Sequence, residues 1–411
     1  MSKNKILLQK PKLTPTLLTI IFLLITLMQV TTDLYIPSLP GITAAFASTA
    51  EKIQLTLSVY MLGFSASHLF YGPISDRIGR KKPILVGVGI SALGSLVCFV
   101  APSATILILG RFIQGIGIGC CNSVGRSLAR DLLSDRMLAK IGSHIGMASV
   151  IILALSPTVG GYVQQYLGWR ANFLFLLIFG LAIWVLTYYL LPETNRHCNP
   201  DATKVAVMAS NYLILLRSKT FMGYTLCSCF AGAGLIAYLT VAPFLLQERL
   251  GLSPVEYGWL AFIIAAAIFI SGFINSKLVL KKGISTMVLW GAIIMLEGGV
   301  VMMAVAWYER LSVSTFMIPI FVFSLGAGFT FINAFAGAFD PFPKMAGTTG
   351  ALFGCLQDLS SALVSAMMAI LAVNNQNLLA VMLILLSIFS LFAWKFISVR
   401  SASEKRAFTS H

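Results

Sequence analysis

Long apolar runs separated by short polar intervals form the main pattern along this chain of 411 residues. A run of about 20 apolar residues, folded as an α-helix, is long enough to cross the roughly 30 Å hydrocarbon core of a bilayer. Because such runs recur throughout the chain, we predict an all-α polytopic membrane protein with twelve spanning helices. The predicted spans lie near residues 15–37, 53–74, 83–102, 104–127, 140–165, 170–191, 220–246, 255–279, 285–307, 313–338, 347–371 and 377–398.

The composition agrees with this pattern. Hydrophobic residues make up 58% of the chain and charged residues only 10%, whereas about a quarter of the residues in soluble domains are charged. The 7 cysteines are odd in number, and most of them lie within apolar segments, so they indicate no disulfide framework. We also expect no metal site and no cofactor.

The longest polar interval divides the predicted spans into two sets of six. We predict an N-terminal six-helix bundle over 1–192, a cytoplasmic linker over 193–219 and a C-terminal six-helix bundle over 220–411. The loops GPISDRIGRKKP (72–83) and GFINSKLVLKKG (272–283) match each other in a glycine and several basic positions. Such repetition is typical of transporters built from two similar halves, which hold the substrate between them near the bilayer midplane.

The basic residues gather in alternate loops. Most of the 29 Lys and Arg residues lie on the side of the N-terminus, and the exceptions in the opposite loops are Lys52, Arg170, Arg249 and Arg310. This bias follows the positive-inside rule, so we predict that both termini are cytoplasmic. The net charge of +15 is then a consequence of topology, and we expect no nucleic-acid partner.

Three acidic residues, Asp33, Glu297 and Asp358, interrupt predicted spans. An acid at the centre of a membrane helix costs roughly 2.5 to 3.5 kcal/mol on insertion scales, so such residues usually face a cavity or a partner. We therefore expect Glu297 and Asp358 to face a cavity, where they suit a cationic ligand. Protonated acids bonded to a neighbouring helix are the alternative.

The full set of residues that we assign to a candidate substrate cavity is Gln114, Glu297, Asp358, Tyr60 and Tyr238. Two histidines within the spans, His68 and His144, can titrate in the physiological range. Lone histidines in helices are more often hydrogen-bonded structural residues, and that is the interpretation we favour for both.

The segment GPISDRIGRKKPIL (72–85) resembles the loop motif G-x-x-x-D-R-x-G-R-[KR] of the major facilitator superfamily. The resemblance implies two pseudo-symmetric six-helix bundles and a cytoplasmic gate in this loop. The matching positions are Gly72, Asp76, Arg77, Gly79 and Arg80. From the residues themselves, we expect Gly72 to let neighbouring helices approach and Asp76 to face a helix N-terminus of the opposite half. Charges that serve only to fix the topology are the alternative.

Two further segments resemble motifs of the same superfamily. LGRFIQGIGIG (109–119) is similar to its fourth-helix motif and places Arg111 in hydrocarbon, one turn from Gln114. A buried guanidinium needs a partner. LSPTVGGYV (155–163) is similar to the motif associated with antiporters, in which proline and glycine residues kink and pack the helix. Its positions here are Pro157, Gly160 and Gly161.

The stretches DLYIPSLPGI (33–42) and GWRANFLF (168–175) look like the drug:proton antiporters of the Bcr/CflA, or bicyclomycin-resistance, type. That resemblance associates Asp33 and Arg111 with proton coupling. At 1.5 Å per residue, both positions lie roughly 6 to 11 Å below the outer ends of their helices. We therefore expect the two side chains to meet and Asp33 to bind a proton or cation. A static ion pair between two helices is the alternative.

The resulting hypothesis is proton-coupled export of drugs or other small amphipathic compounds across the bacterial inner membrane by alternating access. Export of an endogenous metabolite such as a siderophore, or nutrient uptake by proton symport, stays open. An enzyme is disfavoured because the chain has no P-loop, zinc-protease or serine-hydrolase motif. A channel is disfavoured because symmetric halves with a charged loop suit a rocking motion. The expected partners are a small-molecule substrate, protons and lipid, and the expected state is a monomer.

Overall fold

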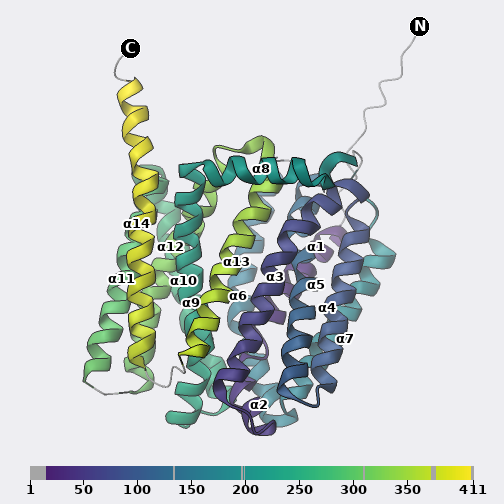
Figure 1. The fold of residues 1–411 in the computed structure, drawn as a ribbon, viewed down its shortest axis with the longest axis vertical. Helices are drawn as coiled ribbons and strands as arrows, with labels where there is room; N and C mark the ends of the chain where they lie inside the picture. Colours follow the sequence, from purple (N-terminus) through teal and green to yellow (C-terminus); the bar gives the residue numbers. More distant parts are fainter. Residues whose placement is uncertain are drawn as a thin grey trace.

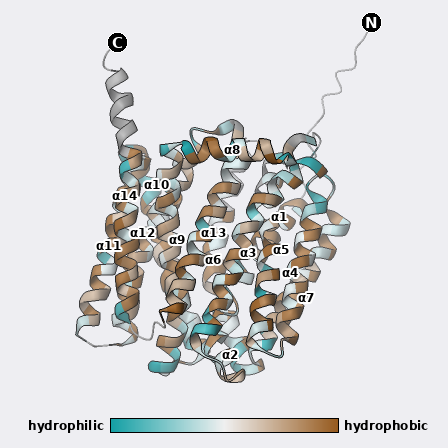
Figure 2. Ribbon diagram, in the orientation of Figure 1, coloured by the Kyte–Doolittle hydropathy of each residue, from teal (hydrophilic) through white to brown (hydrophobic). Residues whose placement is uncertain are grey.

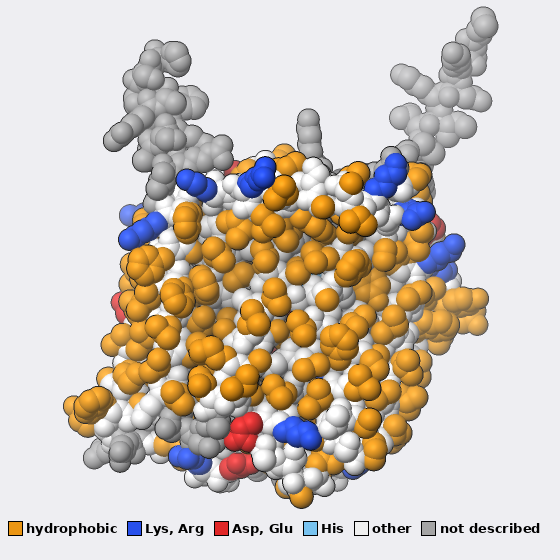
Figure 3. Space-filling model, in the orientation of Figure 1, with side chains coloured by type: hydrophobic (Ala, Val, Ile, Leu, Met, Phe, Trp, Pro, Cys, Tyr) orange, Lys and Arg blue, Asp and Glu red, His pale blue; other side chains and the backbone are white. Residues whose placement is uncertain are grey.

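Nearly all of the described backbone is helical, and twelve of the helices are long and apolar enough to cross a membrane (Figure 1). The structure is a computed structural model that describes residues 15–132, 135–195, 198, 200–308, 311–371 and 376–408. Within these residues, the prediction of twelve spans is confirmed. Hydrophobic segments cover the middle of the helices (Figure 2), and the visible face carries a broad apolar belt with most of its charged side chains toward the two ends (Figure 3).

The first half of the molecule, as we use the term, consists of the helices up to residue 190. They are α1 (Pro15–Asp33), η1 (Ile36–Ser38), α2 (Leu39–Ala45), α3 (Ala50–Ile78), α4 (Lys81–Val100), α5 (Ala104–Leu132), α6 (Asp135–Leu167) and α7 (Trp169–Leu190). The predicted first span therefore does not end as one helix near residue 37. It breaks after Asp33, and η1 and α2 continue it to Ala45.

The second half begins at residue 219. Its helices are α9 (Lys219–Pro243), η3 (Phe244–Arg249), α10 (Pro254–Lys282), α11 (Ile284–Trp307), α12 (Val313–Phe339), η4 (Pro343–Met345), α13 (Ala346–Ile370) and α14 (Gln376–Phe408). Between the halves lie η2 (Pro200–Thr203) and α8 (Val205–Arg217). The sequence did not predict α8, which is too short to cross a bilayer and lies across one end of the bundle (Figure 1). We call this the linker end and the opposite one, where α2 lies, the far end.

Several helix ends follow from local chemistry. Ser253 and Glu256 form a capping box at the start of α10, where each accepts a backbone hydrogen bond that the first turn cannot satisfy internally. Gly79 and Gly283 end α3 and α10 with φ angles of 97° and 82°. These conformations disfavour side chains with a Cβ atom, so glycine at both positions sets the sharp change of direction into the next span.

The two halves meet mainly along two pairs of helices. α3 of the first half packs on α13 of the second half, and α6 packs on α10. The α6–α10 contact lies toward the far end, where Gly161 faces the backbone of Pro254 and Gly258 faces that of Pro157. At the same end, Gln247 Nε2 donates a hydrogen bond of 3.0 Å to the carbonyl oxygen of Pro37. The far end is therefore closed by contacts between the halves.

Candidate functional site

Asp33 lies at the last position of α1 and is buried, with 2% of its surface exposed. Gln29, one turn earlier, donates a hydrogen bond of 2.5 Å from Nε2 to Asp33 Oδ2. Asp33 lines a cavity of about 50 Å³ between the halves. The other lining residues are Leu153, Pro157, Leu235, Tyr238, Leu239, Ala261 and Ile264. The acid that the sequence singled out is thus on a surface shared by both halves.

Arg111 of α5 is fully buried and lies between two aromatic rings. Its guanidinium carbon is 4.1 Å from the ring centre of Tyr35 and 3.9 Å from that of Tyr60. Its Nη1 donates to the carbonyl oxygen of Thr31 at 3.1 Å and to Gln114 Oε1. The Nε and Nη2 atoms are buried and have no hydrogen-bond partner in the described protein. Cation–π contacts in this desolvated site therefore provide much of the stabilisation of the positive charge of Arg111.

The expected meeting of Asp33 and Arg111 does not occur as a direct ion pair. Among the described side chains, the salt bridges are formed by other residues, because Gln29 binds Asp33 while two tyrosine rings flank the guanidinium. Arg111 is nevertheless close enough for its charge to act on Asp33, and it contacts Tyr35, two residues further along the chain. The two groups are neighbours that the structure keeps apart.

The residues assigned to a substrate cavity have different places in the structure. Tyr238 lines the cavity beside Asp33. Tyr60 and Gln114 do not, because both are completely buried around Arg111. Gln114 also donates from Nε2 to Ser95 Oγ at 2.7 Å, and Tyr60 shares a hydrogen bond of 3.0 Å with Thr32. These two side chains position the guanidinium instead.

Asp358 of α13 has a partner that sequence reasoning missed. Its Oδ2 lies 2.8 Å from His68 Nε2 on α3, so the pair joins the two halves. The histidine side chain is 2% exposed and the aspartate side chain 17% exposed. The two residues are 290 positions apart in the chain, and no local pattern relates them. Of the two histidines, the side chain of His144 lies outside the described residues.

For Glu297, the structure differs from what we expected from the sequence. Its side chain is exposed on α11, on the same face as Ile293 and Val301, rather than turned toward a cavity. The adjacent Gly298 and Gly299 face inward, against the backbones of α12 and α14. These glycines take the inner face of the helix, so the acid is turned to the outer one.

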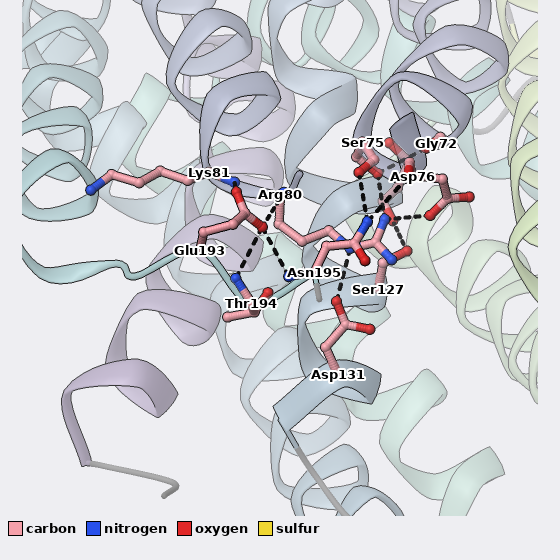
Figure 4. Close-up of polar contacts among 11 residues, drawn as sticks. Gly72, Ser75, Asp76, Arg80, Lys81, Ser127, Asp131, Glu193, Thr194 and Asn195 are labelled. Carbon is pink, nitrogen blue, oxygen red and sulfur yellow. Dashed lines mark hydrogen bonds and ion pairs between the residues drawn. The ribbon is translucent and has the colours of Figure 1, made fainter. Parts of the chain in front are cut away.

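The loop between α3 and α4 is organised by one arginine (Figure 4). Arg80 donates from Nη1 to Asp76 Oδ1 at 2.5 Å and from Nε to Asp131 Oδ2 of α5 at 2.8 Å. Its Nη1 also donates to Ser75 Oγ at 2.7 Å. Burial opposes the charged form of Arg80, but the hydrogen bonds and charges of Asp131 and Asp76 outweigh it and hold the pKa of Arg80 above its ordinary value.

Glu193, just after α7, closes the same loop from the other side (Figure 4). Its carboxylate accepts hydrogen bonds from the backbone N–H groups of Arg80 at 2.8 Å and Lys81 at 3.2 Å. The glutamate oxygens approach Gly79 so closely that a Cβ atom there would overlap them. Gly79 is therefore needed both for its φ angle and for this contact, and the sequence motif alone did not indicate Glu193.

The remaining gate residues differ in part from expectation. Gly72 does not serve close helix approach, because a Cβ atom there would meet no atom within 4 Å. Arg77 donates from Nη1 to Thr203 Oγ1 at 2.8 Å, so it ties α3 to the linker. Asp76 lines a pocket at the linker end together with Gly347 and Thr348, in the first turn of α13. It is near the helix N-terminus we expected, although its hydrogen bond goes to Arg80.

The glycines of the α6 motif sit at contacts between helices. A Cβ atom on Gly160 would overlap the carbonyl oxygen of Leu34, directly after Asp33, and one on Gly161 would overlap that of Pro254. Pro157, inside α6, lines the cavity with Asp33. The expected packing role is thus observed, and it brings α6 against both the end of α1 and the start of α10.

Similarity to known proteins indicates what this arrangement does. Residues 21–365 match the family model described as Major Facilitator Superfamily. The chain is 32% identical over 395 residues to Multidrug resistance protein D of Escherichia coli, covering 94% of this chain and 97% of that protein. It is 27% identical to the Bicyclomycin resistance protein homolog of Haemophilus influenzae, covering 91% and 94%. It is 28% identical to Multidrug resistance protein MdtL of Shigella dysenteriae, covering 92% and 94%.

Among solved structures, the fold is similar to a partially occluded inward-open conformation of the xylose transporter XylE from E. coli. The TM-score is 0.72 at 14% identity, over 93% of this chain and 98% of that one. The human organic anion transporter MFSD10 is similar at a TM-score of 0.69 and 17% identity, over 94% and 100%. At these identities, the likeness concerns the arrangement of the helices alone.

Proposed function

The chain belongs to the major facilitator superfamily, and on that premise we propose that it exports drugs or other small amphipathic compounds in exchange for protons. The observation that carries the proposal is the cavity between the halves, in which Asp33 is the acidic member of a lining that is otherwise uncharged. Relatives named for multidrug and bicyclomycin resistance support drug export over metabolite export or nutrient uptake. Twelve spans and bacterial relatives make the chain a multi-pass inner-membrane protein.

At about 50 Å³ the cavity has room for little more than water, but when the halves move apart its wall suits a compound with an apolar body and a positive charge. Leu153, Leu235, Leu239 and Ile264 are apolar, and the buried ring of Tyr238 offers an aromatic face. A single carboxylate in such surroundings attracts a cationic group while the apolar wall tolerates different shapes. The same carboxyl group can bind either the compound or a proton, which makes the two ligands competitors for one site.

Arg111 contributes to this competition although it does not line the cavity. When Asp33 is ionised, the nearby guanidinium stabilises its negative charge, and the unpartnered Nε and Nη2 atoms of Arg111 are available to a carboxylate that moves toward them. When Asp33 is protonated, that attraction is lost.

The membrane potential supplies enough energy for this exchange. A potential near 150 mV contributes roughly 3.5 kcal/mol for each positive charge that moves inward, enough for a few-hundredfold concentration gradient of a neutral solute.

The same proposal includes the sidedness and organisation of the protein. The linker end faces the cytoplasm, because the basic loop from Arg77 to Lys82 and the linker lie there. Residues 1–192 and 220–411 rock as two bundles around the cavity, and 193–219 connect them. The network around Arg80 holds the cytoplasmic gate, and the protein works as a monomer.

The test is transport by the purified protein in proteoliposomes with an imposed pH gradient. Drug accumulation driven by protons is expected for the wild type and is expected to be absent for Asp33→Asn, while exchange of a labelled neutral compound, which does not depend on the carboxylate, persists. Glu297→Gln is the matched control, because it neutralises an acid that faces away from the cavity. An Asp33→Asn protein that still responds to the pH gradient as the wild type does contradicts the proposal.

A further inference from the structure

A second pair of titratable residues lies away from Asp33, at the contact between α3 and α13. His68 and Asp358 come from different halves and are joined at 2.8 Å. Next to them, Ser65 donates from Oγ to the carbonyl oxygen of Cys355 at 2.8 Å. Toward the far end, Ser58 and Ser365 are hydrogen bonded at 2.9 Å. The His68–Asp358 pair is the charged member of this series of contacts.

The side chains and backbone around the His68 ring fix its position. Gly354 of α13 leaves room for the ring, since a Cβ atom there would lie 3.2 Å from His68 Cε1. Phe64, one turn earlier on α3, also packs against the ring, with ring centres 4.7 Å apart. The ring is thus held with its Nε2 toward Asp358, so that small changes in the α3–α13 distance act directly on the pair.

The pair also lies where water and protons from the linker end can reach it. His68 lines the same pocket as Asp76 of the gate loop. This pocket runs between the halves, since its walls include Ser123 and Ser127 of α5 and Gly350 of α13. Opening of the halves at the linker end therefore exposes His68 directly.

We propose that His68 and Asp358 form a second proton-binding site, which fastens the two halves together when His68 carries a proton. An imidazolium facing a carboxylate makes a charge-assisted hydrogen bond, whereas a neutral imidazole keeps only an ordinary one. Loss of the proton to water in the adjacent pocket weakens the contact and favours separation of α3 from α13. This inference rests on the proposed cytoplasmic sidedness, under which proton release accompanies opening to the cytoplasm, as drug exchange requires.

One face of α3 connects this site to the first one. Tyr60, Phe64 and His68 recur every fourth residue, so their side chains stack along one side of the helix. The ring centres of Tyr60 and Phe64 are 6.1 Å apart, and Tyr60 packs on Arg111. These groups all belong to the first half, so movement of α3 away from α13 carries the row of rings and Arg111 along together.

The other titratable groups around the pair are few in the part of the chain that the structure describes. Those close enough for the charge of Asp358 to act on them are Tyr60 of α3, Cys229 of α9 and Cys355 of α13. Asp76 shares the pocket with His68, where α5 contributes uncharged polar side chains and α12 contributes Phe339. Tyr212 of α8 hydrogen bonds to the carbonyl oxygen of Leu69. Histidine is the type among these with an ordinary pKa near neutrality.

Hydrogen exchange of the full-length protein, without drug or gradient, tests the proposal. Backbone exchange in residues 64–75 and 346–356 is measured at about pH 6 and about pH 8, which bracket the ordinary pKa of histidine, after correction for the intrinsic rate. We expect a roughly tenfold increase in opening at the higher pH for the wild type, because the ordinary hydrogen bond that remains is weaker than a charge-assisted one. The variants His68→Gln and Asp358→Asn are expected to show the same degree of opening at both pH values.

Three further variants decide the interpretation. Ser58→Ala removes an uncharged contact between the same helices and is expected to keep the pH response. The exchange of the two residues, His68→Asp with Asp358→His, is expected to restore the response, and it tests the proposal even where a single variant fails to fold. Asp33→Asn is expected to keep it as well, which separates this inference from the proposed drug coupling. A His68→Gln protein that shows the pH response of the wild type overturns the inference. Loss of the pH response in the single variant Asp33→Asn also overturns it.

Discussion

The guanidinium of Arg111 lies 3.9 Å from the centre of the Tyr60 ring and is held there rather than against a carboxylate. A second ring, that of Tyr35, lies on the guanidinium at 4.1 Å. Tyr35 follows Asp33 by two residues, and Tyr60 precedes His68 by two helical turns. Through these rings, the buried cation contacts α3, which carries His68, and the segment that directly follows Asp33.

We predict that the Tyr60 ring, more than its hydroxyl group, stabilises the protein. Tyr60→Phe keeps the cation–π contact and loses one hydrogen bond to Thr32, which costs about 1 kcal/mol. Tyr60→Leu also loses the ring, which costs about 2 kcal/mol more in a desolvated site. Thermal melting in detergent is therefore expected to rank wild type above Tyr60→Phe and Tyr60→Phe above Tyr60→Leu. Equal melting of the two variants would show that the ring contributes little.

The gate network around Arg80 is expected to be insensitive to pH near neutrality. The pKa of Arg80 is raised in the folded protein, so its stabilising contribution is complete at every pH below the ordinary pKa of arginine, which is far above neutrality, and is lost only as the pH rises beyond it. After correction for the intrinsic rate, hydrogen exchange of residues 76–82 is predicted to be the same at about pH 6 and about pH 8. Asp131→Asn, which leaves one acid on Arg80, is expected to increase exchange equally at both values.

Glycine is predicted to be essential at one gate position and dispensable at another. Gly79→Ala places a Cβ atom at a φ of 97° and against the Glu193 carboxylate, and the backbone strain alone costs about 1 to 2 kcal/mol. Gly72→Ala adds a methyl group where nothing lies within 4 Å, and inside a helix alanine is favoured by roughly 0.5 to 1 kcal/mol. The melting temperature is expected to fall for the first variant and to stay or rise for the second.

Glu297 is predicted to lower the stability of the membrane-embedded protein. Because its side chain faces outward from α11, replacing it with leucine removes an acid whose cost on insertion scales is of the order of 2.5 kcal/mol. Glu297→Leu is expected to melt no lower than the wild type in lipid nanodiscs and to transport normally. Gly298→Ala, one residue away, is the contrasting variant, since its Cβ atom would lie 2.6 Å from the Phe323 nitrogen. Loss of transport in Glu297→Leu would place this acid in the transport path after all.

Local sequence features were sufficient for much of the fold. Each span is predicted by its own length and hydrophobicity, because a helix in hydrocarbon must satisfy its backbone hydrogen bonds internally. The gate positions follow from a short motif within one loop. Asp33 and Arg111 were found because a charge inside an apolar segment is conspicuous wherever the rest of the chain lies.

What the sequence by itself determined is therefore the number of spans, the likeness to a family and the charged residues that need an explanation. Only the tertiary structure decided which charges meet, because His68 and Asp358 are brought together by the contact between two bundles and by no local pattern. It also decided which way Glu297 faces, because α11 is apolar on nearly all sides and its rotation about its own axis depends on glycines packed against neighbouring helices. Burial and orientation are properties of the assembled helices, and they keep the Asp33 carboxyl group apart from the ring-bound cation of Arg111, although the sequence led us to expect that the two side chains meet.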